Sequence, residues 1–132
     1  MDQYTHHYKF GDVTWHREGT FTEEEGHATD LIANEAVEFL RSKRDKDRPF
    51  FLYVPFTVPH YPLQEPETWT APYNDAIENE SRILYAASMT HMDGAVGKIL
   101  AALEVEGIEE NTLVIFSSDN GGQEQWQGGA DQ

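Results

Sequence analysis

Two adjacent oxygen donors, Asp119 and Asn120, stand where a strongly apolar run of the sequence ends. The run 112–116 (TLVIF) is followed by SSDNGG, so both side chains belong to a glycine-containing turn. A carboxylate and an amide carbonyl suit Ca²⁺ or Mg²⁺, and neither is a ligand that a soft metal prefers. The alternative is an Asx-type turn, in which Asp119 bonds to its own loop. One pair cannot fill the roughly six or more positions around such an ion, so other ligands would come from elsewhere.

A second candidate is His60, in the segment Pro59-His60-Tyr61-Pro62. Pro59 fixes the backbone that enters the histidine, and Pro62 restricts Tyr61 to extended conformations. An imidazole presented from such a stiff loop suits hydrogen bonding to an oxyanion or proton donation to a leaving group. The alternative is a histidine that is merely packed in its loop.

The other histidines and the large aromatic residues carry weaker signals. His91 lies within a predicted helix, and we expect it on the helix face, bonded to a neighbouring loop. The remaining histidines have no spacing that argues for a metal site: His6, His7, His16 and His27. Four aromatic residues could stack on a sugar, with packing as the alternative: Trp15, Tyr61, Trp69 and Trp126.

Two helices are predicted. The first runs from about Thr29 to Lys43, capped by Thr29 or Asp30. Its apolar residues form one stripe: Leu31, Ile32, Ala36, Phe39 and Leu40. The second runs from about 79 to 106, and Gly107 supplies its end. Its apolar residues recur at steps of four and three: Tyr85, Met89, Met92, Val96, Ile99 and Leu103.

Two apolar runs, 50–54 (FFLYV) and 112–116, predict buried strands, because both faces of each are apolar. A proline-rich irregular stretch, 55–73, follows the first run. Strands that alternate with helices favour an α/β fold with a mostly parallel sheet flanked by helices. Ligands of such sheets bind beyond the carboxyl ends of the strands, so His60 and Asp119 are expected at one edge.

Composition narrows the class of protein. The 132 residues carry a net charge of −15, which argues against nucleic acid and anionic membranes as partners. The aromatic fraction of 12% is that of a globular protein. There is no cysteine, so disulfides and thiolate chemistry are excluded within these residues. No apolar run approaches the roughly 20 residues that cross a bilayer.

Five blocks of sequence together resemble the middle of the type I sulfatase (arylsulfatase) family, in that family's order and spacing. They span roughly residues 12 to 122, and the block that ends in Ser-Asp-Asn-Gly-Gly is the most specific. The blocks are GHATDLIANEAVEF (26–39), RPFFLY (48–53), PHYPL (59–63), YAA with HMDGAVG (85–97) and NTLVIFSSDNGG (111–122).

The resemblance implies a partial alkaline-phosphatase-like sandwich. Residues 1–132 would be the central, incomplete part of a sulfatase catalytic domain, with loop-like ends at 1–25 and 123–132. Asp119 and Asn120 would be ligands of Ca²⁺, with Mg²⁺ as the alternative ion, and His60 would contact the substrate sulfate. The implied reaction is sulfuric ester hydrolysis on a sulfated small molecule or sulfated glycan. Family members are secreted, periplasmic or lysosomal.

The chain also departs from the family pattern at several functional positions. The family nucleophile is a formylglycine made within a C/S-x-P-x-R motif, and this chain contains no such motif. The acidic metal pair of the family's first strand and the lysine beyond the Asp-Asn pair are also missing. Formylglycine is therefore expected in a parent protein, and the free polypeptide is expected to be inactive.

Two alternatives remain open at this point. One is a phosphoesterase of the same fold, although Asn120 after Asp119 favours a single hard cation over a histidine-rich site. The other is a truncated, non-catalytic relative that serves as a binding module. An upstream C/S-x-P-x-R motif would separate the sulfatase from that last possibility.

Overall fold

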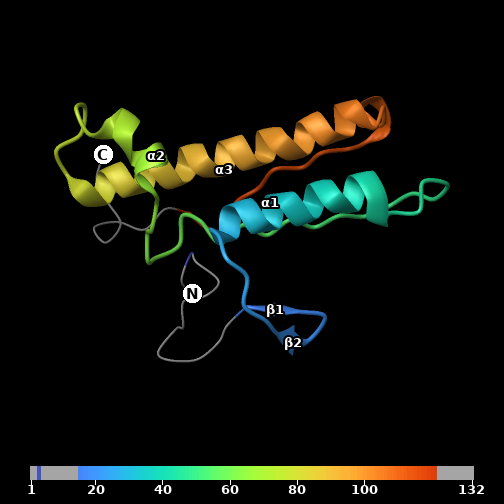
Figure 1. The fold of residues 1–132 in the computed structure, drawn as a ribbon. Helices are drawn as coiled ribbons and strands as arrows, with labels where there is room; N and C mark the ends of the chain where they lie inside the picture. Colours follow the sequence, from blue (N-terminus) through green and yellow to red (C-terminus); the bar gives the residue numbers. More distant parts are fainter. Residues whose placement is uncertain (1–2, 4–14, 122–132) are drawn as a thin grey trace.

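The computed structural model describes residue 3 and residues 15–121 (Figure 1). The predictions for His6, His7, Gly122, Trp126 and the range 123–132 fall outside these residues. The elements in chain order are β1 (His16–Arg17), β2 (Thr20–Phe21), α1 (Ala28–Glu38), the π-helical turn η1 (Phe39–Lys43), α2 (Glu67–Thr70), the 3₁₀ turn η2 (Ala71–Tyr73), α3 (Glu80–Val105) and the 3₁₀ turn η3 (Glu109–Asn111).

Both predicted helices are confirmed. Together α1 and η1 cover the first, and η1 ends with a wide turn in which Arg44 N–H donates to the Phe39 carbonyl at 3.0 Å. The predicted caps, Thr29 or Asp30, are wrong, because His27 holds the N-cap position with extended backbone. Its Nδ1 accepts the Thr29 N–H at 3.2 Å, so an imidazole does here what a short polar side chain usually does.

The long helix α3 has the ends that its sequence predicts. At its start, the Asn79 side chain accepts the Arg82 N–H at 3.1 Å, which satisfies one orphan donor of the first turn. At its end, Gly107 adopts φ +66°, a left-handed conformation that glycine accepts without a Cβ penalty.

Small side chains let α1 and α3 pack closely, side by side along their lengths (Figure 1). Ala33 and Ala36 of α1 are buried, as are Ala95 and Ala102 of α3. A methyl side chain keeps the two backbones near each other and loses no rotamer entropy on burial. Larger apolar residues fill the far end of this interface: Leu40 and Leu103, with Val37, Phe39, Phe50, Leu52, Ile99 and Ile108 against them.

The two predicted buried strands do not form in the described part of the chain, so the predicted mostly parallel sheet is not confirmed there. Runs 50–54 and 112–116 have no strand pairing, and Phe51 and Ile115 are 90% and 79% exposed. A strand needs neighbouring backbone for its ladder and a covered face for its side chains. Apolar sequence alone supplies neither, and the described residues are mainly helical, so the predicted sandwich is not confirmed in them.

The sheet that the described residues do contain is the antiparallel hairpin of β1 and β2. His16 pairs with Phe21 and Arg17 pairs with Thr20, across a turn whose central residues, Glu18 and Gly19, both have positive φ. Arg17 then reaches α1 through Glu35 at 2.7 Å. Among the described helices, none combines the length and apolarity required to cross a bilayer.

Candidate functional site

The loop after run 50–54 presents His60 to solvent. The Val58–Pro59 and Tyr61–Pro62 peptide bonds on either side of it are cis. Its ring Nδ1 lies 2.6 Å from the Tyr61 carbonyl oxygen. A carbonyl can only accept, so Nδ1 carries the proton and donates it. The remaining ring nitrogen, Nε2, is therefore the atom that His60 can offer to another molecule.

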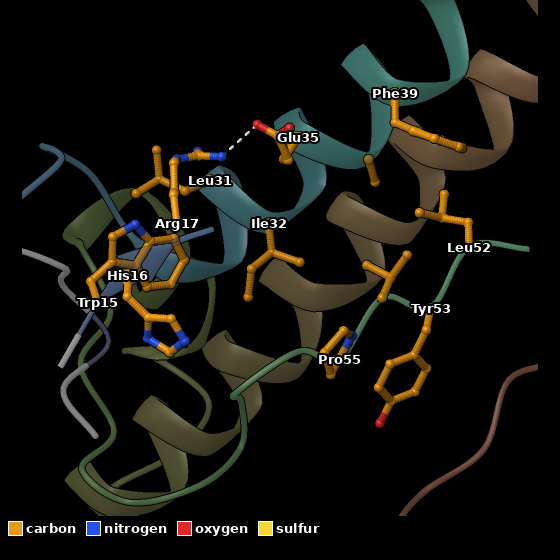
Figure 2. Close-up of a pocket in the computed structure, with 12 residues that line it drawn as sticks. Trp15, His16, Arg17, Leu31, Ile32, Glu35, Phe39, Leu52, Tyr53 and Pro55 are labelled. Carbon is orange, nitrogen blue, oxygen red and sulfur yellow. Dashed lines mark hydrogen bonds and ion pairs between the residues drawn. The ribbon is translucent and has the colours of Figure 1, made fainter. Parts of the chain in front are cut away.

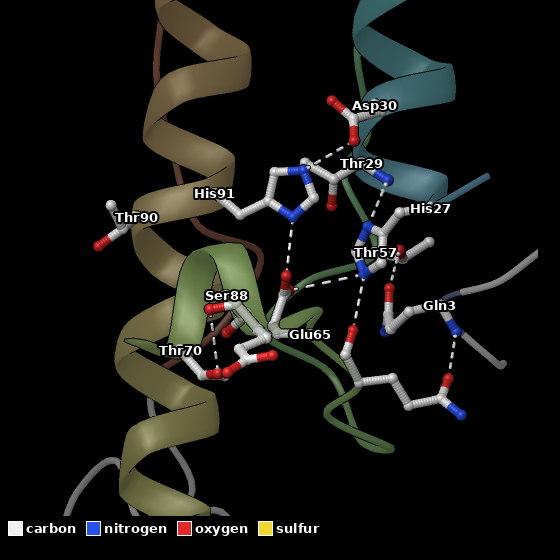
Figure 3. Close-up of polar contacts among 12 residues, drawn as sticks. Gln3, His27, Thr29, Asp30, Thr57, Glu65, Thr70, Ser88, Thr90 and His91 are labelled. Carbon is white, nitrogen blue, oxygen red and sulfur yellow. Dashed lines mark hydrogen bonds and ion pairs between the residues drawn. The ribbon is translucent and has the colours of Figure 1, made fainter. Parts of the chain in front are cut away.

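A buried glutamine, Gln3, forms hydrogen bonds with this loop. The Gln3 side chain donates from Nε2 to the His60 carbonyl at 3.1 Å, and its Oε1 accepts the Thr57 hydroxyl at 2.7 Å. The His60 N–H also donates to the Thr57 carbonyl at 3.0 Å. Figure 3 shows Gln3 and Thr57 facing each other beside the start of α1. The sequence contained no signal for this arrangement, because Gln3 lies more than 50 residues from its partners.

Asp119 and Asn120 lie in an exposed turn beyond run 112–116. Asp119 Oδ1 accepts the Asn120 N–H at 2.9 Å, and the Ser118 hydroxyl donates to the Asn120 carbonyl at 2.6 Å. The Asp119 side chain thus bonds to the next residue, whereas an Asx turn requires a bond to the N–H two residues on, so neither the Asx turn nor the metal site is decided by this contact. Asp119 keeps a second carboxylate oxygen and Asn120 keeps its amide oxygen. These hard donors fit part of a Ca²⁺ coordination shell.

No hydrogen bond or ion pair joins His60 to Asp119 or Asn120 within the part of the chain that the structure describes. The joint role of these three residues, expected at one edge of a sheet, stays a prediction. The sequence placed them correctly in loops that follow apolar runs.

A separate buried polar cluster connects α1, α3 and the loop before α2 (Figure 3). Its centre is Glu65, whose side chain is fully buried, between two buried histidines. Glu65 Oε2 lies 2.8 Å from Nδ1 of His91, and Glu65 Oε1 lies 3.5 Å from Nε2 of His27. On its other side, His91 Nε2 lies 3.1 Å from Oδ2 of Asp30. Trp69 stacks on the His91 ring at 4.7 Å.

The contacts of His91 set its protonation state. Both ring nitrogens face carboxylate oxygens, so both carry protons and the ring is an imidazolium. Burial lowers the pKa of His91, but the hydrogen bonds and charges of Glu65 and Asp30 outweigh burial and hold that pKa above its ordinary value. The sequence prediction that His91 bonds to a neighbouring loop is confirmed by Glu65.

His27 is held in the opposite state. Its Nδ1 accepts the Thr29 N–H, so its single proton sits on Nε2, which donates to the Gln64 carbonyl at 2.8 Å. Burial lowers the pKa of His27 below its ordinary value, and the nearby Glu65 charge only partly offsets burial. Two neighbouring histidines, with ring centroids 4.6 Å apart, therefore differ in charge because of their partners.

His27, Glu65 and His91 each place one ligand-type atom within 4.8 Å of the others. Two imidazoles and a carboxylate would suit Zn²⁺ better than Ca²⁺. His27 Nε2 and His91 Nδ1 both carry protons here, and a metal would bind only by displacing them. The hydrogen bonds and ion pairs of the cluster are those of a buried ion-pair network. Sequence spacing missed it, since its members lie far apart in sequence, at the cap of α1, in the loop before α2 and in α3.

An apolar groove of about 280 Å³ lies between α1, the hairpin and segment 52–55 (Figure 2). Leu31, Ile32 and Phe39 line one side, and Tyr53 and Pro55 line the other. The candidate aromatic residues have different surroundings. Trp15 lines the groove and donates from Nε1 to Glu24, Trp69 packs on His91, and Tyr61 is exposed.

Comparison with known proteins places nearly all of the chain in one family. The profile of the Sulfatase family matches residues 1–129. A protein named Sulfatase from Formosa agariphila is 35% identical over 125 residues, which cover 86% of this chain and 22% of that protein. Arylsulfatase J of Mus musculus is 38% identical over 87 residues, which cover 66% of this chain and 14% of that protein. N-acetylgalactosamine-6-sulfatase of Rattus norvegicus is 33% identical over 115 residues, which cover 81% of this chain and 21% of that protein.

The structural comparison agrees. The crystal structure of Ps i-CgsB in complex with k-i-k-neocarrahexaose matches with a TM-score of 0.68 and 33% identity, covering 75% of this chain and 22% of that one. A second crystal structure of Ps i-CgsB matches with a TM-score of 0.67. The chain thus spans about a fifth of the length of these proteins. Because one family profile covers nearly all of it and its relatives agree along its length, the chain belongs to the sulfatase family.

Proposed function

We propose that this chain supplies part of the active site of a sulfuric ester hydrolase. In this proposal His60 binds the substrate sulfate, and Asp119 with Asn120 supplies part of a Ca²⁺ site. Family membership supports the reaction class, and the curated relatives named above are all sulfatases, so nothing among them favours the phosphoesterase alternative. The observation that carries the role of His60 is the hydrogen bond from its Nδ1 to the Tyr61 carbonyl.

That hydrogen bond decides which atom of His60 acts. With Nδ1–H committed to the backbone, the ring meets substrate through Nε2. In the imidazolium form, Nε2–H donates to a sulfate oxygen or transfers its proton to the leaving oxygen of the ester. A positioned acid of this kind contributes about 10²–10⁴-fold to a rate. The exposure of the ring suits a group that meets substrate from solvent.

Asp119 and Asn120 fit a hard cation by the chemistry of their donors. The bond from Asn120 N–H to Asp119 Oδ1 orients the carboxylate, and it leaves Oδ2 for a ligand role. The Asn120 amide oxygen adds a second donor of the same hardness. Ca²⁺, or Mg²⁺ in its place, would supply positive charge that neutralises the sulfate oxygens. The remaining ligands and the nucleophile would come from parts of the protein outside this chain.

Sulfated glycans are the substrate class that we propose. The support is the relative named N-acetylgalactosamine-6-sulfatase, together with a structural neighbour that was crystallised with a neocarrahexaose. Both names point to sugar sulfates. Among the described candidates, the exposed Tyr61 lies next to His60 and would stack on a sugar ring.

The test uses the full-length protein that contains this segment. Asp119→Ala is expected to abolish Ca²⁺ binding, measured by calorimetry, and hydrolysis of 4-nitrophenyl sulfate. His60→Ala is expected to lower kcat by about 10²–10³-fold while Ca²⁺ binding is retained. Asp75→Ala removes another exposed carboxylate and serves as the matched control, with no expected effect. Full activity in Asp119→Ala would end the proposed metal role.

A further inference from the structure

We propose that Gln3 is a positioning residue that sets the orientation of the His60 imidazole. The inference rests on the proposed function of His60 and adds a residue that neither the motifs nor the family comparison singled out. Gln3 is fully buried, and every hydrogen-bonding group it has is used within this region.

The four contacts of Gln3 join two parts of the chain. Its backbone carbonyl accepts the Ala28 N–H at 2.6 Å, which anchors it to the first residue of α1. Its backbone N–H donates to the Gln64 side chain at 2.8 Å. Its side chain spans the space between the Thr57 hydroxyl and the His60 carbonyl. The loop from 57 to 64 is therefore fastened to a helix end at three points through one residue.

A side-chain amide suits the two central contacts because it carries a donor and an acceptor on neighbouring atoms. The His60 carbonyl accepts, so it must face the Gln3 NH₂ group, and the Thr57 hydroxyl then donates to the Gln3 oxygen. A carboxylate would lose the donor, and an apolar side chain would lose both groups. Each lost hydrogen bond of this kind costs about 0.5–1.5 kcal/mol and frees this part of the loop to shift.

The contact lies one peptide away from the bond that orients the ring. Gln3 holds the carbonyl of His60, and the His60 ring donates to the carbonyl of Tyr61. Rotation of the intervening peptide would move the acceptor of the Nδ1–H bond and, with it, the direction of Nε2. A misplacement of about 1 Å at a reacting group can cost roughly 10²-fold in rate. Gln3 therefore acts through His60, without touching substrate.

The experiment is a double-mutant cycle in the full-length protein, with kcat and KM for 4-nitrophenyl sulfate as readout. Gln3→Met keeps the size of the side chain and removes both hydrogen bonds. We expect it to lower kcat about 10–100-fold with KM changed less than about threefold. In the His60→Ala background the same substitution is expected to have no further effect on kcat, because the group that it positions is gone.

A second variant keeps the test decisive if Gln3→Met does not fold. Thr57→Val removes only the hydroxyl that bonds to Gln3, and it should show a smaller loss with the same dependence on His60. Thr112→Val is the matched control, since Thr112 is likewise half-buried with one hydroxyl bond, to the Ile108 carbonyl at 2.7 Å.

The outcomes separate the two proposals. Full activity in His60→Ala would overturn the proposed function itself, whatever Gln3 does. An impaired His60→Ala beside a fully active Gln3→Met would overturn the positioning role alone. Equal losses from Gln3→Met, or from Thr57→Val, with and without His60 would show a purely structural role and would also overturn it.

Discussion

Replacing Glu65 with glutamine is the most direct test of how the buried cluster stabilises this fold. Glu65→Gln keeps the shape of the side chain and an oxygen that can accept the His91 Nδ1–H, but it removes the negative charge. His91 would then retain only Asp30 as a charged partner, at 3.1 Å and on a half-exposed side chain. The change therefore isolates the charge of one buried ion pair.

The magnitude follows from distance and burial. At 2.8 Å the attraction between Glu65 and His91 amounts to about 6 kcal/mol for an effective dielectric constant of about 20. Desolvation of both groups cancels much of this attraction, and removing one partner of a buried pair usually costs about 3–5 kcal/mol. Because glutamine keeps the hydrogen bond and Asp30 remains, we expect the free energy of unfolding to fall by about 3 kcal/mol, the low end of that range.

The loss should depend on pH with a definite sign. The folded pKa of His91 is raised, so its stabilising contribution is fully present below about pH 6.5 and disappears as pH rises through the folded pKa. The difference between wild type and Glu65→Gln is therefore largest near pH 6 and shrinks in alkali.

Urea unfolding of the chain, followed by circular dichroism at several pH values, measures this difference. Glu35→Gln is the matched control, because Glu35 pairs with Arg17 and Lys43 at the surface, where loss of a pair costs below about 1 kcal/mol. Equal stability of Glu65→Gln and Glu35→Gln, or a difference that grows with pH, would refute the ion-pair assignment.

Two further predictions concern His27 and Gly107. The folded pKa of His27 is lowered by burial, so its contribution is complete above about pH 6.5 and is lost as pH falls through the folded pKa. His27→Asn keeps a capping side chain, and it should unfold less readily in acid than wild type does, when urea midpoints are compared below pH 6.5. Gly107→Ala, at φ +66°, should destabilise by about 1–2 kcal/mol. Gly97→Ala, inside α3 with open space at its Cβ, should instead stabilise by about 0.5–1 kcal/mol in the same assay; the reverse order would contradict the backbone argument.

The sequence by itself determined the helices. The apolar stripe and Gly107 predicted α3 to within a residue at each end, because helical hydrogen bonds join residues four apart and the pattern is local. The apolar runs 50–54 and 112–116 were found, but their pairing was not, since a strand depends on partners distant in sequence. The loops that carry His60 and Asp119 were also placed by sequence, from prolines and glycines that punctuate the chain.

Only the tertiary structure decided what surrounds those residues. Whether a histidine is charged depends on the atoms that face its ring, and Glu65 and Asp30 reach His91 from other elements. Gln3 reaches His60 across 57 positions of sequence. No periodic pattern in the sequence predicts such contacts, because the packing of α1 against α3 and the path of the loop bring the partners together. The sequence identified candidate residues such as His60 and Asp119, whereas tertiary contacts determine the protonation states and orientations of the side chains.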